Sequence, residues 1–235
     1  DRSPSRGLGD VYKRQAVNAY NTLKDNGMKV FIGTVTTGAC LSVVSQTKAD
    51  NMFQITPSAS AAKVIANDNC FQVCFTDPNQ GTASADYIAS KGLATKVAVI
   101  YNSSDAYSSG IYDNFKAEAA AKGLDLVASE AFTGDSKQDF SSQLSKIKAS
   151  GAELIFLPIY YQEASLILSQ AKNAGITAKF FGCDGLDGLL NIENFDKSLA
   201  ENVMLLTPFA ANATDETTKK FVAAYNAKYD PSTLC

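Results

Sequence analysis

Short apolar runs alternate with segments of helical periodicity along most of the chain, and this alternation limits the possible folds more than any other feature of the sequence. Runs of this length, rich in Val, Ile, Leu or Phe, are typical of strands that are covered on both faces. The clearest are MKVFIG (28–33), MFQIT (52–56), KVAVIY (96–101), ELIFLP (153–158) and NVMLLT (202–207). Strands that alternate with helices predict parallel sheets with right-handed crossovers, which is the α/β class.

The segments between these runs have the spacing of amphipathic helices. Ala164, Ile167, Leu168 and Ala171 follow one another at i, i+3, i+4 and i+7, which places them on one helix face. Together the helices and runs predict a complete small doubly wound domain, with strands at 97–101, 126–131, 153–158, 179–182 and 202–206. The stretch 16–75 supplies only two strands, too few for a domain of its own.

We therefore expect two doubly wound parallel-sheet lobes, of which the N-terminal lobe is incomplete. The proline-containing stretches CFTDPNQG (74–81) and LTPFA (206–210) interrupt the pattern and are expected to connect the lobes. The predicted division assigns 16–76 and 208–235 to the first lobe and 77–207 to the second.

The first fifteen residues, DRSPSRGLGDVYKRQ, are charged and loop-like, and they resemble translated adapter sequence. We expect residues 1–15 to be a non-native or disordered leader. The C-terminal DPSTLC follows a helical pattern without a further strand. The expectation is a fragment truncated at both ends.

Composition excludes several classes of function. A net charge of −3 over 235 residues provides no positive field for nucleic acid, and the sequence contains no histidine to act as a general base. There is no Gly-x-Ser-x-Gly elbow, and GTVTTG (33–38) lacks the glycine spacing of a dinucleotide site. We therefore expect a protein that is not an enzyme and has no cofactor and no metal.

The five cysteines also lack the spacing of a zinc site. Cys70 and Cys74 are expected on one strand, about 13 Å apart, which is too far for a disulfide. The simplest interpretation is that the thiols belong to the core.

Ligands of open parallel sheets bind beyond the carboxyl ends of the strands, so the residues that follow each predicted strand are candidates for a site. Hydroxyls at a helix N-terminus suit a carboxylate, because unpaired N–H groups lie beside them. Ser and Thr are also ordinary helix caps, and this alternative stays open. The polar residues at the strand ends are Thr36, Thr37, Ser58, Ser60, Tyr107, Tyr160, Tyr161 and Asp184.

Asp184 is the most informative of them. A carboxylate in a closing cleft is costly unless a cation meets it, and FFGCDGLDG (180–188) contains neither Lys nor Arg. A ligand ammonium would balance the charge, although Asp184 could instead be a solvated turn residue. Asp187 is the weaker candidate. The tyrosines would add an aromatic wall, or merely pack at the rim. A ligand with a carboxylate, an ammonium and an apolar remainder is a free amino acid.

Several motifs together resemble the periplasmic-binding-protein type 1 family, and within it the leucine/isoleucine/valine-binding proteins of ABC transporters. They are IGTVTTGACLSVV, ITPSASAA, FQVCFTDPNQG, KVAVIYNSSDAYSSG, DFSSQLSKIKASGAELIFLPIYYQEASLILSQAKNAGI and FFGCDGLD. The resemblance covers about residues 16–235. It implies two α/β lobes, joined by three crossovers, that close on a ligand.

The resemblance also implies roles for individual residues. On the first lobe, Thr37 matches a hydroxyl that binds the ligand carboxylate. Ser58 matches a position that binds through its backbone, and Ser60 one that binds through its hydroxyl and N–H. Asp77 matches an acid of the first crossover and is expected to be a hinge residue.

On the second lobe, Tyr107 and Tyr160 match aromatic residues of the cleft, and Asp184 matches the acid that binds the ammonium. Thr36 stands where some relatives have a disulfide cysteine, so that bridge is not expected here.

The function implied is capture of an amino acid, with a branched-chain one favoured, and its delivery to an ABC-transporter permease. The location implied is the periplasm or the outer face of the cytoplasmic membrane, with the signal sequence missing. The alternative is the ligand-sensing domain of a receptor or regulator with the same fold.

Overall fold

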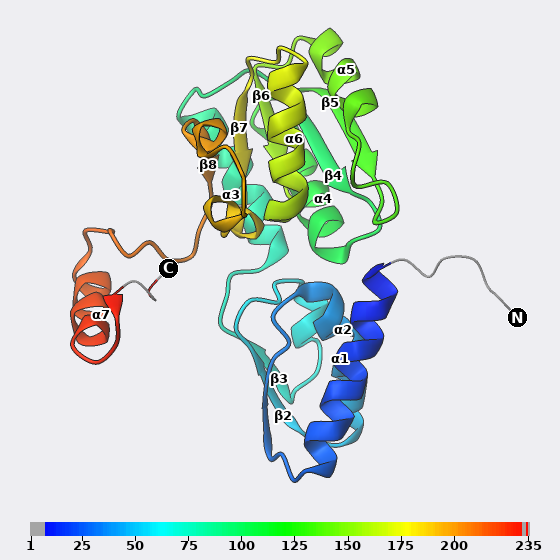
Figure 1. Cartoon of the computed structure of the whole chain (residues 1–235), viewed down its shortest axis with the longest axis vertical. Helices are drawn as coiled ribbons and strands as arrows, with labels where there is room; N and C mark the ends of the chain where they lie inside the picture. The colour runs from blue at the N-terminus through cyan, green and yellow to red at the C-terminus, as the bar shows by residue number, and fades with distance from the viewer. Residues whose placement is uncertain (1–7, 232–233, 235) are drawn as a thin grey trace, which may run out of the picture.

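The computed structural model describes residues 8–231 and 234, with side chains from residue 13 onward. Its strands form two separate parallel sheets, a three-stranded sheet of order β1-β2-β3 and a five-stranded sheet of order β5-β4-β6-β7-β8. The chain that leaves β3 passes directly into the second unit at α3 (Figure 1). We call the first sheet with its helices the first lobe and the second sheet with its helices the second lobe. The predicted α/β class with two parallel-sheet lobes is confirmed.

The first lobe contains a third strand, which the count of two strands in 16–75 did not include although Cys70 and Cys74 were expected on one strand. This strand, Cys70–Gln72, has only three residues and pairs in parallel with its neighbour. Cys74 lies beyond the end of this strand, which corrects the expectation that Cys70 and Cys74 share one strand. The elements are α1 (Leu8–Asp25), β1 (Val30–Ile32), α2 (Thr37–Ala49), β2 (Phe53–Thr56), the 3-10 helix η1 (Ala62–Ile65) and β3 (Cys70–Gln72).

The expected leader is partly helical, which is a second correction. Helix α1 begins at Leu8 and continues without interruption to Asp25, whereas residues 1–7 lie outside the described part of the chain. Residues 8–15 contain no proline, since the last proline before the helix is Pro4. Each of them can therefore add a backbone hydrogen bond to a helix that is nucleated in the later residues of α1.

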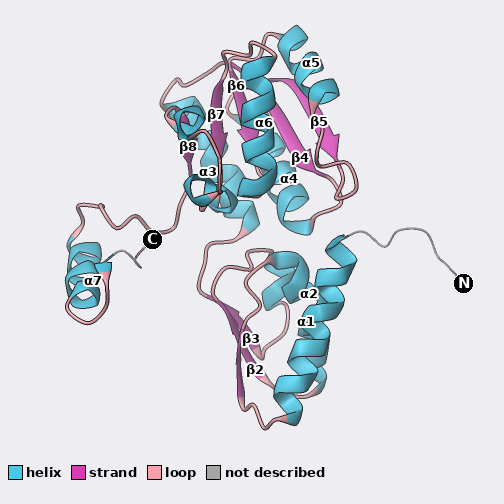
Figure 2. Ribbon diagram, viewed as in Figure 1, coloured by secondary structure: helices cyan, strands magenta, loops and turns pink. Residues whose placement is uncertain are grey.

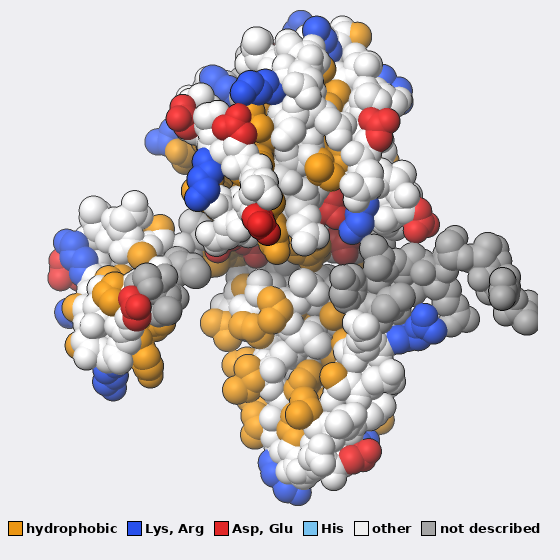
Figure 3. All heavy atoms as spheres, viewed as in Figure 1, with side chains coloured by type: hydrophobic (Ala, Val, Ile, Leu, Met, Phe, Trp, Pro, Cys, Tyr) orange, Lys and Arg blue, Asp and Glu red, His pale blue; other side chains and the backbone are white. Residues whose placement is uncertain are grey.

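Helices cover only one face of the three-stranded sheet. Tyr20 of α1, Phe31 of β1 and Val43 of α2 pack together and are buried on that face. On the other face the strands expose large apolar side chains, which form part of the apolar surface of the lower unit in Figure 3. This bare face comprises Val30, Ile32, Phe53 and Phe71.

The second lobe agrees with the predicted strands and helices. Its elements are α3 (Asp77–Ser90), β4 (Lys96–Asn102), α4 (Ala106–Ala121), β5 (Asp125–Phe132), α5 (Ser141–Ser150), β6 (Leu154–Leu157), α6 (Tyr161–Asn173), β7 (Lys179–Gly182), three 3-10 helices (η2, Asp184–Leu186; η3, Leu189–Asn191; η4, Lys197–Ala200) and β8 (Val203–Leu205).

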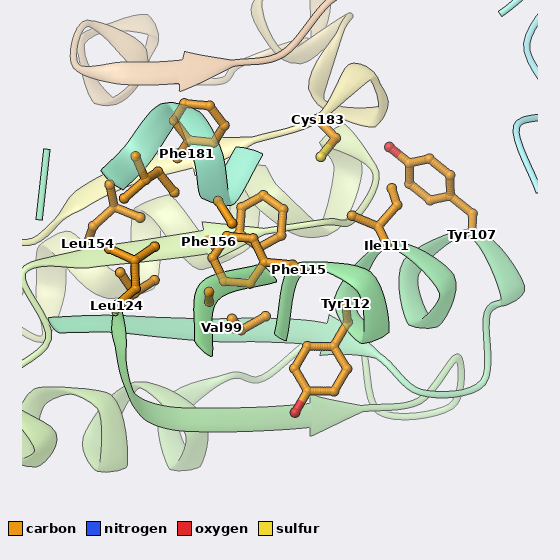
Figure 4. Packing of buried hydrophobic residues seen from close by; sticks show 14 residues of the cluster. Val99, Tyr107, Ile111, Tyr112, Phe115, Leu124, Leu154, Phe156, Phe181 and Cys183 are labelled. Atoms are coloured by element: carbon orange, nitrogen blue, oxygen red, sulfur yellow. The ribbon is translucent and has the colours of Figure 1, made fainter. Parts of the chain in front are cut away.

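Both faces of the five-stranded sheet are buried under helices of this lobe (Figure 2). Successive residues of a strand point to opposite faces. Leu154 and Phe156 therefore pack against α3 and α4, in the cluster drawn in Figure 4, and Ile155 and Leu157 pack against α5 and α6. Each of these four strand residues is fully buried, which explains the continuous apolar run at this position.

The last helix, α7 (Glu216–Asn226), stands apart from both sheets in Figure 1, and none of its residues is buried. The residue boundaries predicted for the lobes, including the assignment of 208–235 to the first lobe, stay a prediction.

Candidate functional site

A cavity of about 340 Å³ lies between the two lobes, which is within the usual range for small-molecule sites. Loops of the first lobe supply one wall, and strand-end loops of the second lobe supply the other. Six of the eight strand-end residues singled out in the sequence line it together, namely Thr36, Ser58, Tyr107, Tyr160, Tyr161 and Asp184, and so does the weaker candidate Asp187. The remaining lining residues are Val35, Gly185, Thr207, Pro208 and Phe209.

Asp184 begins the 3-10 turn that follows β7, and Tyr107 holds this turn. The Tyr107 hydroxyl donates to Oδ1 of Asp184 at 2.6 Å and accepts the backbone N–H of Gly185 at 2.9 Å. Figure 4 shows Tyr107 on α4 with its ring directed toward the loop after Cys183. A Cβ atom at residue 185 would lie 2.7 Å from the Tyr107 hydroxyl oxygen, so this turn requires glycine. The carboxylate is thus fixed in orientation.

Asp184 has no cationic partner in the part of the chain that the structure describes. None of the ion pairs among the described residues includes it. Burial raises the pKa of the Asp184 carboxyl above its ordinary value, while the side chains of Tyr107 and Gln80 oppose that rise. A buried carboxylate of this kind is strongly stabilised when a positive group approaches it. The carboxylate of Asp184 is therefore suited to bind an ammonium group.

The tyrosines form an aromatic wall beside the carboxylate. The rings of Tyr107 and Tyr160 are stacked, with centroids 4.8 Å apart and planes inclined by 18°. Burial raises the pKa of both hydroxyls well above the ordinary value, so both are neutral donors at physiological pH. Tyr107 lies in the first turn of α4, whose N-cap Asp105 accepts the backbone N–H of Ser108 at 3.1 Å.

On the first lobe, the predicted hydroxyls divide into two groups. Ser58 lines the cavity, whereas Thr37 and Ser60 are buried behind it and are not among the lining residues. The Thr37 hydroxyl accepts the backbone N–H of Ser60 at 3.1 Å, and the Ser60 hydroxyl has no hydrogen-bond partner in the structure. Thr36, the N-cap of α2, does line the cavity, and its side chain makes no capping bond. The described structure therefore leaves the hydroxyls of Thr36 and Ser60 available to other partners.

The expectation that Ser58 and Ser60 open a helix is wrong. They lie in a loop, and the helix that follows is the single 3-10 turn η1, which begins only at Ala62. The polar turn NDN at 67–69 leads straight into β3, so too few residues remain for an α-helix.

Asp77, the predicted hinge residue, begins α3 directly after the crossover. Its backbone N–H donates to the Ser60 carbonyl at 2.9 Å, which joins the second lobe to a first-lobe loop. Its side chain is buried, and neither carboxylate oxygen has a well-formed hydrogen bond. The pKa of Asp77 is raised to about 7, mainly by burial; the Ser60 hydroxyl opposes the rise, and the nearby carboxylates of Asp184 and Asp105 contribute to it.

A second cavity, of about 560 Å³, continues the gap between the lobes and shares Thr36, Tyr160 and Tyr161 with the first. Its charged lining includes Lys137 and Glu163, which form an ion pair at 3.3 Å. Of the two acids that line this cavity, Glu163 and Asp105, Glu163 is thus already paired, in contrast to Asp184.

The sequence reasoning missed several residues of the site. Thr207, Pro208 and Phe209 belong to LTPFA, which had been interpreted only as a linker, although a linker between lobes must pass the cleft. Gln80 was missed because it lies on a helix rather than at a strand end. Among the described residues, no three His, Cys, Asp or Glu side chains gather as a metal site would require.

The fold is that of a two-lobed α/β protein with a cavity between its lobes. The chain belongs to the periplasmic binding protein family, whose sequence profile matches residues 13–234. It is 33% identical over 175 residues to the Leu/Ile/Val-binding protein homolog 3 of Brucella melitensis, a match that covers 74% of this chain and 47% of the relative.

Solved structures show the same similarity. A leucine-binding protein of Thermotoga maritima superposes with a TM-score of 0.82 at 26% identity, covering 95% of this chain and 63% of that one. A branched-chain amino acid transporter substrate-binding protein of Streptococcus pneumoniae, solved with isoleucine, gives 0.80 at 28% identity, covering 91% and 61%. The chain therefore spans only about half to two thirds of the length of these proteins.

Proposed function

We propose that the protein containing this chain captures a free branched-chain amino acid between its lobes. The observation that carries the proposal is the carboxylate of Asp184, which is fixed by Tyr107, largely buried, and not ion-paired with any described residue. An α-ammonium would neutralise it, and the cavity has room for the apolar remainder of the ligand beside the Tyr107–Tyr160 stack. This ligand class is supported by the relative named as a Leu/Ile/Val-binding protein homolog and by the related structure that was solved with isoleucine.

On the opposite wall, Ser58 and the hydroxyls of Thr37 and Ser60 are proposed to receive the ligand carboxylate as the lobes close. The Ser60 hydroxyl, buried and unpaired, supports this assignment. In the same proposal Asp77 belongs to the hinge, and 16–76 and 208–235 form the first lobe around 77–207.

The wider role that we propose is delivery of the amino acid to an ABC-transporter permease, outside the cytoplasmic membrane. The ABC-transporter proteins among the structural relatives support it. Within the described residues, no helix combines the length and apolar character that a membrane crossing needs. Loss of amino-acid uptake in a strain without the gene would support delivery, and unchanged uptake would favour the sensing role instead.

The test of ligand class is a thermal-shift panel of amino acids on the complete protein. A ligand at one hundred times its Kd should stabilise the protein by about 2.7 kcal/mol. Branched-chain amino acids are expected to give the largest shifts, and no shift with any amino acid would contradict the proposal.

Calorimetry on Asp184→Ala tests the site itself. Removing one member of a buried charge pair typically costs about 3–5 kcal/mol, so affinity should fall at least roughly a hundredfold. Asp125→Ala is the matched control, because it removes the same charge from an exposed position at the amino end of β5. An affinity of Asp184→Ala equal to that of the control would remove Asp184 from the site.

A further inference from the structure

Gln80 is a fully buried polar residue on α3 that contacts the turn carrying Asp184. Its side-chain Oε1 accepts the backbone N–H of Asp184 at 3.4 Å, across a sequence separation of 104 residues. Its Nε2 has no hydrogen-bond partner among the described residues. A buried donor left unpaired costs about 1–3 kcal/mol, and an apolar side chain of the same length would avoid that cost. Filling space therefore does not explain why a polar side chain occupies this position.

The packing of α3 on α4 fixes Gln80 relative to Tyr107. A Cβ atom at Gly81 would lie 2.5 Å from the carbonyl oxygen of Ile111 and 2.7 Å from the backbone nitrogen of Phe115, so the two helix backbones are in direct contact there. Gln80 from α3 and Tyr107 from α4 consequently hold two successive backbone N–H groups of one turn, those of Asp184 and Gly185.

The same turn of α3 also contacts the first lobe. Asp77, three residues before Gln80, donates its backbone N–H to the carbonyl of Ser60. The first turn of α3 thus contacts a first-lobe loop through Asp77 and the turn that carries Asp184 through Gln80.

We propose that Gln80 is a positioning residue for ligand binding, which holds Asp184 where the ligand ammonium can reach it and ties that position to the crossover between the lobes. The inference rests on the proposed function. Gln80 acts through Asp184 and is not itself assigned a contact with the ligand.

The first test is the affinity of Gln80→Met for leucine, measured by calorimetry on the complete protein. Met preserves length and volume but cannot accept the Asp184 N–H. Affinity should fall roughly tenfold, the size of one lost hydrogen bond. Gln80→Asn, which keeps an amide but is one methylene too short, should show the same loss and serves if the Met variant does not fold.

Ser84→Ala is the matched control. Ser84 lies one turn further along the same face of α3, is also buried, and contacts Cys183 at 3.8 Å without touching the Asp184 amide. Its affinity should stay within about twofold of the wild type, a range that corresponds to a few tenths of a kcal/mol.

A double-mutant cycle separates positioning from a general effect on folding. In an Asp184→Asn background, Gln80→Met should change affinity by less than about twofold, because the charge that it positions is gone. An equal loss in both backgrounds, or no loss in the wild-type background, would overturn the proposal.

Amide hydrogen exchange on the ligand-free protein gives a readout that does not depend on the ligand class. Gln80→Met should speed exchange at Asp184, whereas Ser84→Ala should not. If no amino acid binds the wild type, the proposed function fails, and faster exchange still supports the contact from Gln80. Unchanged exchange at Asp184 in Gln80→Met would overturn the proposed role of Gln80.

Discussion

In the second lobe, helices cover both faces of the five-stranded sheet, whereas in the first lobe they cover one face of a three-stranded sheet. Phe156 of β6 is fully buried, whereas Phe53 of β2 is 45% exposed. An apolar strand pattern therefore predicts that the strand should be covered, but whether it is covered depends on the other elements that pack on the sheet. The relatives are considerably longer than this chain, which fits a lobe that requires more residues for its cover.

The two lobes also differ in what they bring to the cavity. The second lobe supplies a carboxylate and two stacked tyrosines from a sheet that helices cover on both faces. The first lobe supplies hydroxyls above a sheet with a bare face, and two of these, Thr37 and Ser60, lie behind the cavity wall. The side proposed for the ammonium is thus built more completely than the side proposed for the carboxylate.

The largest expected effect is in the core of the second lobe. Phe156→Ala removes a fully buried ring that stacks on Phe115 with centroids 4.1 Å apart. The free energy of unfolding should fall by about 3–5 kcal/mol in chemical denaturation. Phe53→Ala, on the bare face of the first lobe, is the control and should have a clearly smaller effect. Equal losses would mean that the two sheets are covered alike.

Asp77 should give an intermediate effect that depends on pH. Because burial raises its pKa to about 7, the folded protein holds the proton more tightly than the unfolded chain does. The resulting stability is present below pH 4 and is lost as pH rises to about 7. Asp77→Asn should therefore gain roughly 2–4 kcal/mol relative to the wild type between about pH 4 and pH 8.

Thermal denaturation of both proteins across this range checks the effect of Asp77. The difference in stability should grow up to about pH 7 and then level off. A difference that is independent of pH would show that Asp77 does not ionise from a buried position.

The smallest expected effect is on the bare face. Ile32 is 75% exposed in the structure, so Ile32→Thr should change the free energy of unfolding of this chain by less than about 0.5 kcal/mol. The matched substitution Ile155→Thr, in a fully buried position of β6, should cost several times more. A large loss for Ile32→Thr would show that something covers this face in solution.

Much of the second lobe could be predicted from the sequence because its strands are buried on both faces and read as continuous apolar runs. Asp184 and Tyr160 could be predicted because each lies in the loop just after a strand end. The strand that contains Cys70 was expected, but its end at Gln72 was not, since a pattern of three residues carries no period.

The other features of the site depend on tertiary contacts. The placement of Thr37 behind the cavity follows from its bond to Ser60, and that of Gln80 beside Asp184 from the close approach of α3 to α4. Such contacts join residues far apart in the chain, and local patterns do not report them.

The central claim is that a ligand ammonium balances Asp184. The most direct test is calorimetry of the complete protein with leucine and with 4-methylpentanoate, which is leucine without its ammonium group. The account predicts that the analogue binds at least roughly a hundredfold more weakly, a difference of about 2.7 kcal/mol. Binding of the analogue within about twofold of leucine would contradict it.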